Sequence, residues 1–170
     1  MNLDADAEWM VSKGLLSPMQ RDALNMTALK KFWDSATGLQ LRNLNPERIQ
    51  RELPFTIRLG VTELTDLGIT PADEHPVSND DFIVVQGVAD LAAFLPEGIW
   101  VLDFKTDRVT DSVLKEKIRT YQPQLQIYAI ALQKIYQKPV IRRALYFLEP
   151  GVEVELPEAA PGKSAPLGIP

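Results

Sequence analysis

The sequence contains no cysteine, a single histidine and no long apolar run. The absence of cysteine excludes disulfides, cysteine-ligated zinc sites and thiolate-bound iron–sulfur clusters. A membrane-spanning helix needs about 20 consecutive apolar residues, and the N-terminus has none of the basic and apolar segments of a signal peptide. These absences predict a cytoplasmic protein with no membrane partner.

An excess of positive charge is also lacking, because 18 Lys and Arg stand against 23 Asp and Glu and give a net charge of −5. A free-standing DNA-binding protein normally has a basic surface. Any nucleic acid that this chain acts on is therefore expected to be delivered by another module. The length of 170 residues and the 45% hydrophobic content are those of one ordinary globular domain with a sizeable core.

Two segments have the pattern of a β-hairpin. Residues 83–90 and 99–107 are rich in β-branched and aromatic residues, and 95–98 between them is turn material. A four-residue loop pairs Phe94 with Ile99, and this register sets Asp90 directly opposite Asp103. A loop of three or five residues without a bulge would place the two aspartates on opposite faces.

Alternation along the second strand places Asp103 and Lys105 on one face with Ile99 and Val101, and Trp100, Leu102 and Phe104 on the other. Opposed like charges destabilise a sheet, and a divalent cation would remove this repulsion. Carboxylate oxygens suit Mg2+, which can polarise a phosphoryl oxygen and activate water. Lys105 could then orient the water or stabilise charge that develops in the transition state. The pattern thus favours phosphodiester chemistry, while an ordinary ion pair of Lys105 with Asp103 or Asp107 is the alternative.

Residues 111–137 carry apolar side chains at alternating spacings of four and three, which predicts a helical stripe. Its members are Leu114, Ile118, Tyr121, Leu125, Tyr128, Leu132 and Ile135. Pro123 interrupts the stripe, so we expect two helices that meet near residues 120–122. Tyr121, Gln124 and Tyr128 lie on one side, where they either belong to the core or hold a phosphate and support Lys105.

The N-terminal part is expected to be helical. A helix over residues 4–13 would stop at Gly14, and Ser17 with Gln20 forms a capping box for a helical stretch that continues with interruptions to about Ser35. A further short turn is expected at residues 36–41. We assign no chemistry to this region.

The first strand is expected over residues 48–59, with Leu53, Phe55, Ile57 and Leu59 inward and Glu52 on the opposite face. Residues 66–81 read as a loop, and His75 within it is expected to be exposed. The last strands are expected at 140–149 and 152–156, and the Pro-, Ala- and Gly-rich residues 157–170 are expected to be a disordered tail.

Three motifs in this order resemble one family: Gly87–Asp90 (Gly-Val-Ala-Asp), Asp103–Asp107 (Asp-Phe-Lys-Thr-Asp) and Tyr121–Tyr128 (Tyr-Gln-Pro-Gln-Leu-Gln-Ile-Tyr). They are similar to those of the RecB-type nucleases in the PD-(D/E)XK superfamily, and within it to the nuclease domains of the AddA component of bacterial AddAB helicase–nucleases. The resemblance covers roughly residues 15–154 and includes Arg51–Phe55 and Ala144–Leu148. It implies an α/β fold with a restriction-endonuclease-like core, a mixed sheet of four or five strands flanked by helices, over residues 1–156.

The resemblance also implies roles for individual residues. Asp90, Asp103 and the backbone carbonyl of Phe104 would hold Mg2+, for which Mn2+ can substitute, and Lys105 would assist the nucleophile. Gln124, Tyr128 and Tyr121 would support the site or contact the DNA backbone. Glu52 is either a solvated carboxylate or a residue beside the metal. Asp107 and Arg108 are expected to be exposed to solvent.

The implied activity is metal-dependent hydrolysis of single-stranded and duplex DNA ends during double-strand break repair. The implied partners are helicase domains of the same parent chain, where ATP is used, and a partner protein of the AddB type. The family carries a histidine on an upstream helix, which no residue before Glu52 supplies and which His75 is misplaced to replace. We therefore expect a fragment of a longer protein, inactive alone if its site is incomplete. The alternatives are a catalytically silent module that docks DNA or the AddB-type partner, and a stand-alone nuclease.

Overall fold

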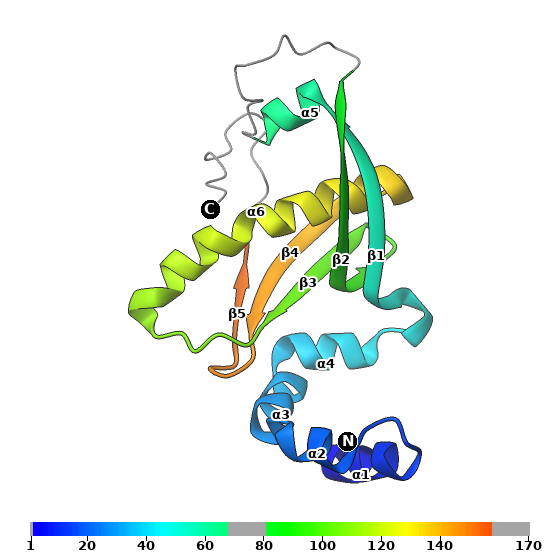
Figure 1. Ribbon diagram of the computed structural model, residues 1–170, viewed down its shortest axis with the longest axis vertical. Coiled ribbons are helices and arrows are strands. Elements are labelled where there is room, and N and C mark those ends of the chain that lie inside the picture. Colours follow the sequence, from blue (N-terminus) through cyan, green and yellow to red (C-terminus); the bar gives the residue numbers. More distant parts are fainter. Residues whose placement is uncertain (1, 68–80, 158–170) are drawn as a thin grey trace.

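A mixed sheet of five strands forms the centre of the computed structural model, which describes residues 2–67 and 81–157 (Figure 1). The strands lie in chain order: β1 (Ile49–Gly60), β2 (Phe82–Phe94), β3 (Ile99–Lys105), β4 (Val140–Phe147) and β5 (Val152–Glu155). Neighbouring strands are antiparallel except β3 and β4, which are parallel. The predicted α/β class and the mixed five-stranded sheet are confirmed, whereas His75 and nearly all of the predicted tail lie outside the described residues.

The hairpin of β2 and β3 has the predicted register. Leu95 and Gly98 close the turn with hydrogen bonds in both directions between their backbones, and Phe94 pairs with Ile99. The ladder continues as far as Leu91 and Leu102. Asp90 and Asp103 are the next residues on each strand, so the two carboxylates lie across from each other where the ladder ends.

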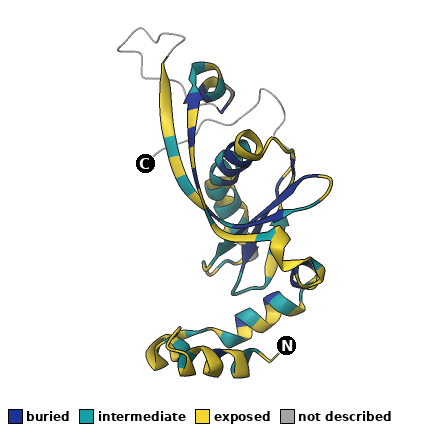
Figure 2. Ribbon diagram, turned by 90° about the vertical axis from the view of Figure 1, so that its right-hand side faces the viewer, coloured by how far each residue is buried: buried dark blue, intermediate teal, exposed yellow. Residues whose placement is uncertain are grey.

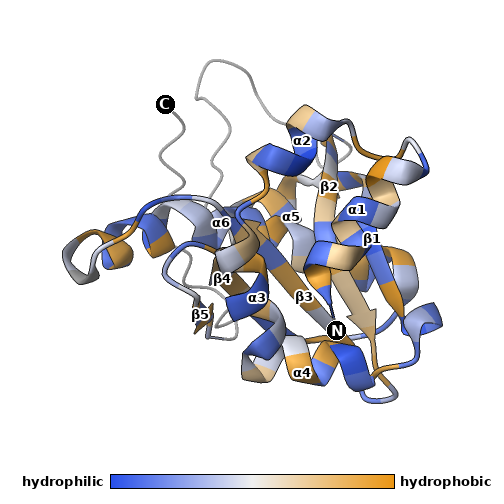
Figure 3. Cartoon of the chain, turned by 90° about the horizontal axis from the view of Figure 1, so that it is seen from below, coloured by the Kyte–Doolittle hydropathy of each residue, from blue (hydrophilic) through white to orange (hydrophobic). Residues whose placement is uncertain are grey.

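Helices cover both faces of the sheet, and the core divides accordingly. On one face Ile99 and Val101 of β3 pack with Tyr128 and Leu132 of α6 (Asp111–Tyr136). On the other face Trp100 and Leu102 pack against Phe32 and Leu41 from the N-terminal helices. Figure 2 shows the buried residues concentrated in the sheet and on the inner side of α6, and Figure 3 shows β3 as an apolar strand between more polar helices. The predicted division of β3 into two faces is therefore confirmed.

The N-terminal helices are α1 (Leu3–Ser12), α2 (Pro18–Ala23), α3 (Met26–Asp34) and α4 (Ala36–Asn43). Gly14, at φ +70°, follows α1, and Ser17 and Gln20 form the predicted capping box. The expected short turn at 36–41 is an eight-residue helix, because Ser35 caps it by accepting a hydrogen bond from the Gly38 amide. A Cβ atom at Gly38 would lie 2.7 Å from Trp33 Cα, so glycine allows α4 to pack closely on α3.

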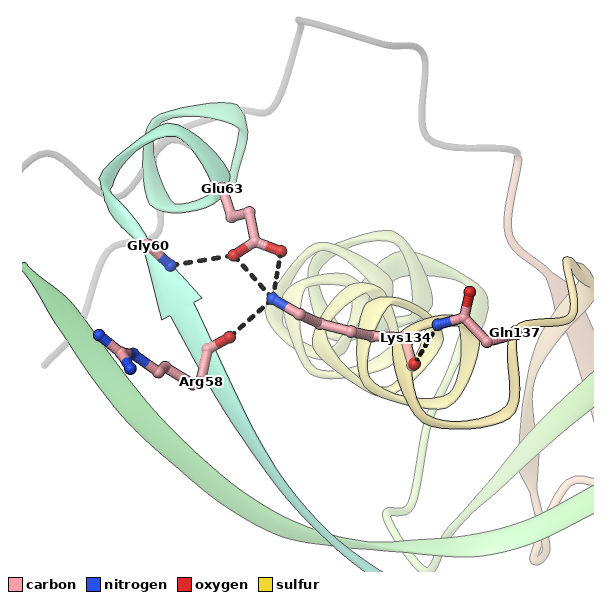
Figure 4. A network of polar contacts seen from close by, with 5 residues as sticks. All are labelled: Arg58, Gly60, Glu63, Lys134 and Gln137. Atoms are coloured by element: carbon pink, nitrogen blue, oxygen red, sulfur yellow. Dashed lines mark hydrogen bonds and ion pairs between the residues drawn. The ribbon is translucent and has the colours of Figure 1, made fainter. Parts of the chain in front are cut away.

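Two short elements complete the described chain, a 3-10 helix at Pro46–Arg48 and α5 (Val61–Asp66). Figure 4 shows how α5 is attached: Lys134 of α6 donates to both carboxylate oxygens of Glu63 and to the Arg58 carbonyl, and Glu63 accepts from the Gly60 amide. This network joins the end of β1, the start of α5 and the last turns of α6. None of the helices in the described ranges is long and apolar enough to cross a membrane.

The expected pair of helices around Pro123 is wrong, because α6 is one continuous helix of 26 residues that contains the proline. Proline in a helix interior costs about 3 kcal/mol. Apolar side chains on both sides of Pro123 pack on the same sheet, Ile118 in the cluster of Leu145 and Phe147, and Leu132 with Val101. Each fully buried aliphatic side chain contributes about 1.5–3 kcal/mol, so burial outweighs the local preference of proline.

Candidate functional site

Two carboxylates form the centre of the site. Asp90 Oδ2 accepts a hydrogen bond of 2.8 Å from the Phe104 amide, so the Asp90 side chain reaches across to β3. Asp103 is only 1% exposed. Burial raises the pKa of the Asp103 carboxyl group, Lys105 lowers it by a smaller amount, and the charge of Asp90 raises it further. The site therefore contains a carboxylate whose charge the protein alone does not fully stabilise.

Lys105 is the cation nearest to this carboxylate. Its Nζ lies 2.7 Å from Asp103 Oδ2, although the contact lacks the alignment of a hydrogen bond and Oδ2 has no hydrogen-bond partner. The same Nζ donates to Gln124 Oε1 at 2.9 Å and lies 4.1 Å from the centre of the Tyr121 ring. The ammonium group is thus held by a carboxylate, an amide and an aromatic face, and its side chain is 13% exposed.

Gln124 and Tyr128 come from the middle of α6 and complete a chain of polar groups. The Gln124 amide nitrogen donates to the Tyr128 hydroxyl, so Gln124 bridges Lys105 and Tyr128. Burial is the main cause that raises the pKa of the Tyr128 hydroxyl, and the charges of Asp103, Asp90 and Glu52 raise it further. The side chains predicted from the three motifs are therefore brought together, and Gln124 and Tyr128 have polar contacts beyond ordinary core packing.

Gly87 of the Gly-Val-Ala-Asp motif gives the Phe55 ring its place. A Cβ atom at Gly87 would lie 2.5 Å from Phe55 Cζ, which is closer than real Cβ contacts allow. The Phe55 ring in turn packs edge-on against Tyr128, with ring centres 5.5 Å apart. A glycine on β2 and a phenylalanine on β1 thus support the aromatic floor below the site.

Glu52 has an unusual backbone. Its φ of +48° is rare for a residue with a side chain. The β1–β2 ladder pairs Arg51 with Leu91 and Leu53 with Ala89, so Glu52 lies across from Asp90 at an interruption of the ladder. Its side chain is exposed, and its charge acts on the Tyr128 hydroxyl. Glu52 is therefore near the site electrostatically.

Asp107 is not solvent-exposed as expected, because it is half-buried between β3 and α6. Its Oδ2 accepts a hydrogen bond of 2.7 Å from the Tyr121 hydroxyl, and its Oδ1 lies 2.7 Å from Lys117 Nζ. Hydrogen bonds from Lys117 and then Tyr121 lower the pKa of Asp107. The sequence analysis did not identify Lys117, although its spacing of four residues from Tyr121 places both on one face of α6. Arg108 is exposed as expected and pairs with Glu149.

The residues at the centre fit a divalent cation with few protein ligands. Within residues 2–67 and 81–157, no group of three or more His, Cys, Asp and Glu side chains is close enough to hold a metal. Mg2+ usually takes one or two carboxylates and completes its shell with water and phosphate. Asp103 offers a buried oxygen without a hydrogen-bond donor, and Asp90 can hold the Phe104 amide with one oxygen and a cation with the other.

Comparisons with known proteins agree with this geometry. A family model described as the PD-(D/E)XK nuclease superfamily matches residues 7–165. Proteins named as subunits of an ATP-dependent helicase/nuclease are similar over 91% of the chain at 35% identity in Carboxydothermus hydrogenoformans, over 91% at 29% in Oceanobacillus iheyensis, and over 84% at 30% in Bacillus licheniformis. The matched region spans 12%, 12% and 11% of those relatives, respectively.

Proposed function

Since the chain belongs to the PD-(D/E)XK nuclease superfamily, we propose that it hydrolyses DNA phosphodiester bonds with the help of Mg2+. The observation that carries this proposal is the convergence of Asp90, Asp103 and Lys105 with Gln124 on one patch of the sheet. These residues come from β2, β3 and α6, and the contacts among them include a buried carboxylate oxygen with no hydrogen-bond donor. An exposed surface ion pair would not need such an arrangement.

In this proposal Asp90, Asp103 and the Phe104 carbonyl hold the cation, which when bound polarises the scissile phosphate and acidifies a water molecule. Mn2+ can take the same place because it also accepts oxygen ligands. Lys105 is the cationic donor that orients the attacking water or stabilises charge on the phosphate. Gln124 fixes the ammonium group of Lys105 and is itself fixed by Tyr128. Tyr121 supplies a second support for Lys105, and Glu52 adds negative charge at the rim.

The proposed setting is that of a larger helicase–nuclease. The relatives are named as ATP-dependent helicase/nuclease subunits, and the chain spans about an eighth of their length. The substrates would be single-stranded and duplex DNA ends at double-strand breaks. Helicase domains would use ATP and deliver a strand to the site, and a protein of the AddB type would be the partner. The net charge of −5 supports delivery by such domains, because this chain has no excess of basic residues with which to capture DNA.

A second candidate is a silent module that keeps the fold and docks DNA or a partner. It is favoured by the ion pair between Lys105 and Asp103, which gives the buried carboxylate a counter-ion without a metal. The two candidates differ in whether Asp103 binds a divalent cation.

Calorimetry with Mg2+ and Mn2+ on the chain and on Asp103→Asn, followed by digestion of single-stranded DNA, tests the proposal. We expect metal binding and cleavage to disappear together in Asp103→Asn. Asp4→Asn is the matched control, because Asp4 also pairs with a lysine, Lys30, but on the exposed N-terminal helices. Metal binding without cleavage would mean that the chain alone is inactive, and no binding at millimolar metal would favour the silent module.

A further inference from the structure

We propose that Asp107 is a positioning residue, which holds the Tyr121 ring in place below the ammonium group of Lys105. This inference rests on the proposed function only in the sense that Lys105 then serves a reaction. The contacts themselves involve neither metal nor DNA. No motif in the sequence assigned Asp107 a role, and its expected place was in solvent.

Both carboxylate oxygens of Asp107 are engaged by α6. Oδ2 accepts from the Tyr121 hydroxyl at 2.7 Å, and Oδ1 pairs with Lys117 Nζ at 2.7 Å. Lys117 and Tyr121 are four residues apart and therefore lie on one side of the helix. Asp107 itself lies two residues beyond the end of β3, the strand whose last residue is Lys105. The carboxylate thus ties the exit of β3 to the helix face that borders the site.

The Tyr121 ring connects this tie to Lys105. The ring centre is 4.1 Å from Lys105 Nζ and 6.5 Å from the Phe147 ring centre. Phe147 and its neighbours hold the body of the ring, and Asp107 holds the hydroxyl end. A cation is attracted to the face of an aromatic ring and not to its edge, so the orientation fixed by Asp107 decides whether Tyr121 supports Lys105.

The other two supports of Lys105 do not define its position by themselves. Asp103 is also the proposed cation ligand, and its contact with Nζ is poorly aligned. Gln124 is a single neutral acceptor. When a cation occupies Asp103, the Tyr121 face and Gln124 are the remaining contacts that hold the ammonium group. Asp107 therefore acts on the proposed chemistry through Tyr121, without contact to substrate.

The test is the NMR signal of the Lys105 side chain in the 170-residue chain with isotope-labelled lysine, recorded without metal or DNA. The Lys105→Arg variant assigns the signal. Protons above an aromatic face are shifted upfield, so we expect the Lys105 Hε signals to lie upfield of those of the other lysines. Asp107→Asn and Tyr121→Phe should both move them toward the ordinary position, because each loses the charged hydrogen bond but keeps the ring.

Glu63→Gln is the matched control, since Glu63 ties α6 to the sheet through Lys134 but far from Lys105 (Figure 4). It should leave the Lys105 signals unchanged. Unmoved Lys105 signals in both Asp107→Asn and Tyr121→Phe would overturn the proposal and leave Asp107 a structural tie. If the chain cleaves DNA, both variants should lower kcat by up to about 100-fold with little change in KM. A chain without nuclease activity would refute the proposed function, while the NMR result would still decide the role of Asp107.

Discussion

Asp90 of β2 accepts the Phe104 amide of β3 at 2.8 Å, so one of the two central carboxylates also fastens the two strands together where their ladder ends. The side chain takes the place of a backbone carbonyl in the ladder. The strands can then separate by the width of the site without leaving the Phe104 amide unpaired. Structure and proposed metal binding therefore depend on the same carboxylate, and the two roles can be separated by substitution.

We expect Asp90→Ala to lower the free energy of unfolding by about 1–3 kcal/mol, because the partly buried Phe104 amide loses its acceptor. Asp90→Asn retains an acceptor oxygen at the same place and should cost clearly less. Both variants should lose divalent-metal binding. Urea unfolding and calorimetry on the two variants check this, and equal destabilisation by Ala and Asn would show that the hydrogen bond does not contribute.

Gly87→Ala should destabilise the protein by about 1–3 kcal/mol, because the added methyl group would overlap the Phe55 ring. The double variant Gly87→Ala with Phe55→Leu removes the overlap. The cost of the alanine should therefore be smaller in the Phe55→Leu background than in the parent chain. A double-mutant cycle from urea unfolding measures this difference, and simple additivity would contradict the packing described for the floor of the site.

Pro123→Ala should stabilise the chain by about 1–3 kcal/mol, because alanine restores a backbone N–H to a continuous helix and removes the clash of the proline ring. Part of this gain is offset by the greater freedom of the unfolded chain, about 0.4–1 kcal/mol. Thermal unfolding measures the change. The exposed neighbour Gln122 provides the control, since Gln122→Ala should alter stability by only a few tenths of a kcal/mol. No gain from Pro123→Ala would mean that α6 breaks at this point in solution.

The ion pair of Glu63 with Lys134 should make stability depend on pH in the acidic range. Hydrogen bonds from Lys134 and then the Gly60 amide lower the pKa of Glu63 in the folded protein. The folded state therefore binds fewer protons than the unfolded state, and the contribution of Glu63 is present above its ordinary pKa and lost as the pH falls through the lowered value. The stability difference between the chain and Glu63→Gln, under about 1 kcal/mol at neutral pH, should shrink below pH 4.5. Urea unfolding at several pH values measures it, and a difference that grows on acidification would contradict this sign.

The hairpin and the central residues could be predicted from the sequence because their geometry is local. A four-residue turn fixes the pairing of Phe94 with Ile99, and alternation then decides the face of Asp103 and Lys105. The helical stripe likewise predicted which side of α6 faces the sheet. These features depend on neighbours in the chain and on two simple periodicities, so one sequence is enough to infer them.

The features that the sequence did not predict depend on contacts between distant elements. Pro123 stays within a continuous helix because two core clusters hold both sides of it, which no window around the proline reveals. Asp107 follows the last residues of a strand, and only the docking of α6 brings Tyr121 and Lys117 to it. The positive φ of Glu52 interrupts a strand whose alternation is otherwise regular, and no glycine marks the position.

The continuity of α6 has a mechanical consequence. The helix is tied to the sheet near its start by Lys117 and near its end by Lys134, and Gln124 and Tyr128 lie between these two ties. Removing one residue from the segment between them would turn one end by about 100° relative to the other. Either a tie or the pair of site residues would then face the wrong way. The span between Lys117 and Lys134 thus has a fixed length, and changes of chain length are compatible with the site only outside it.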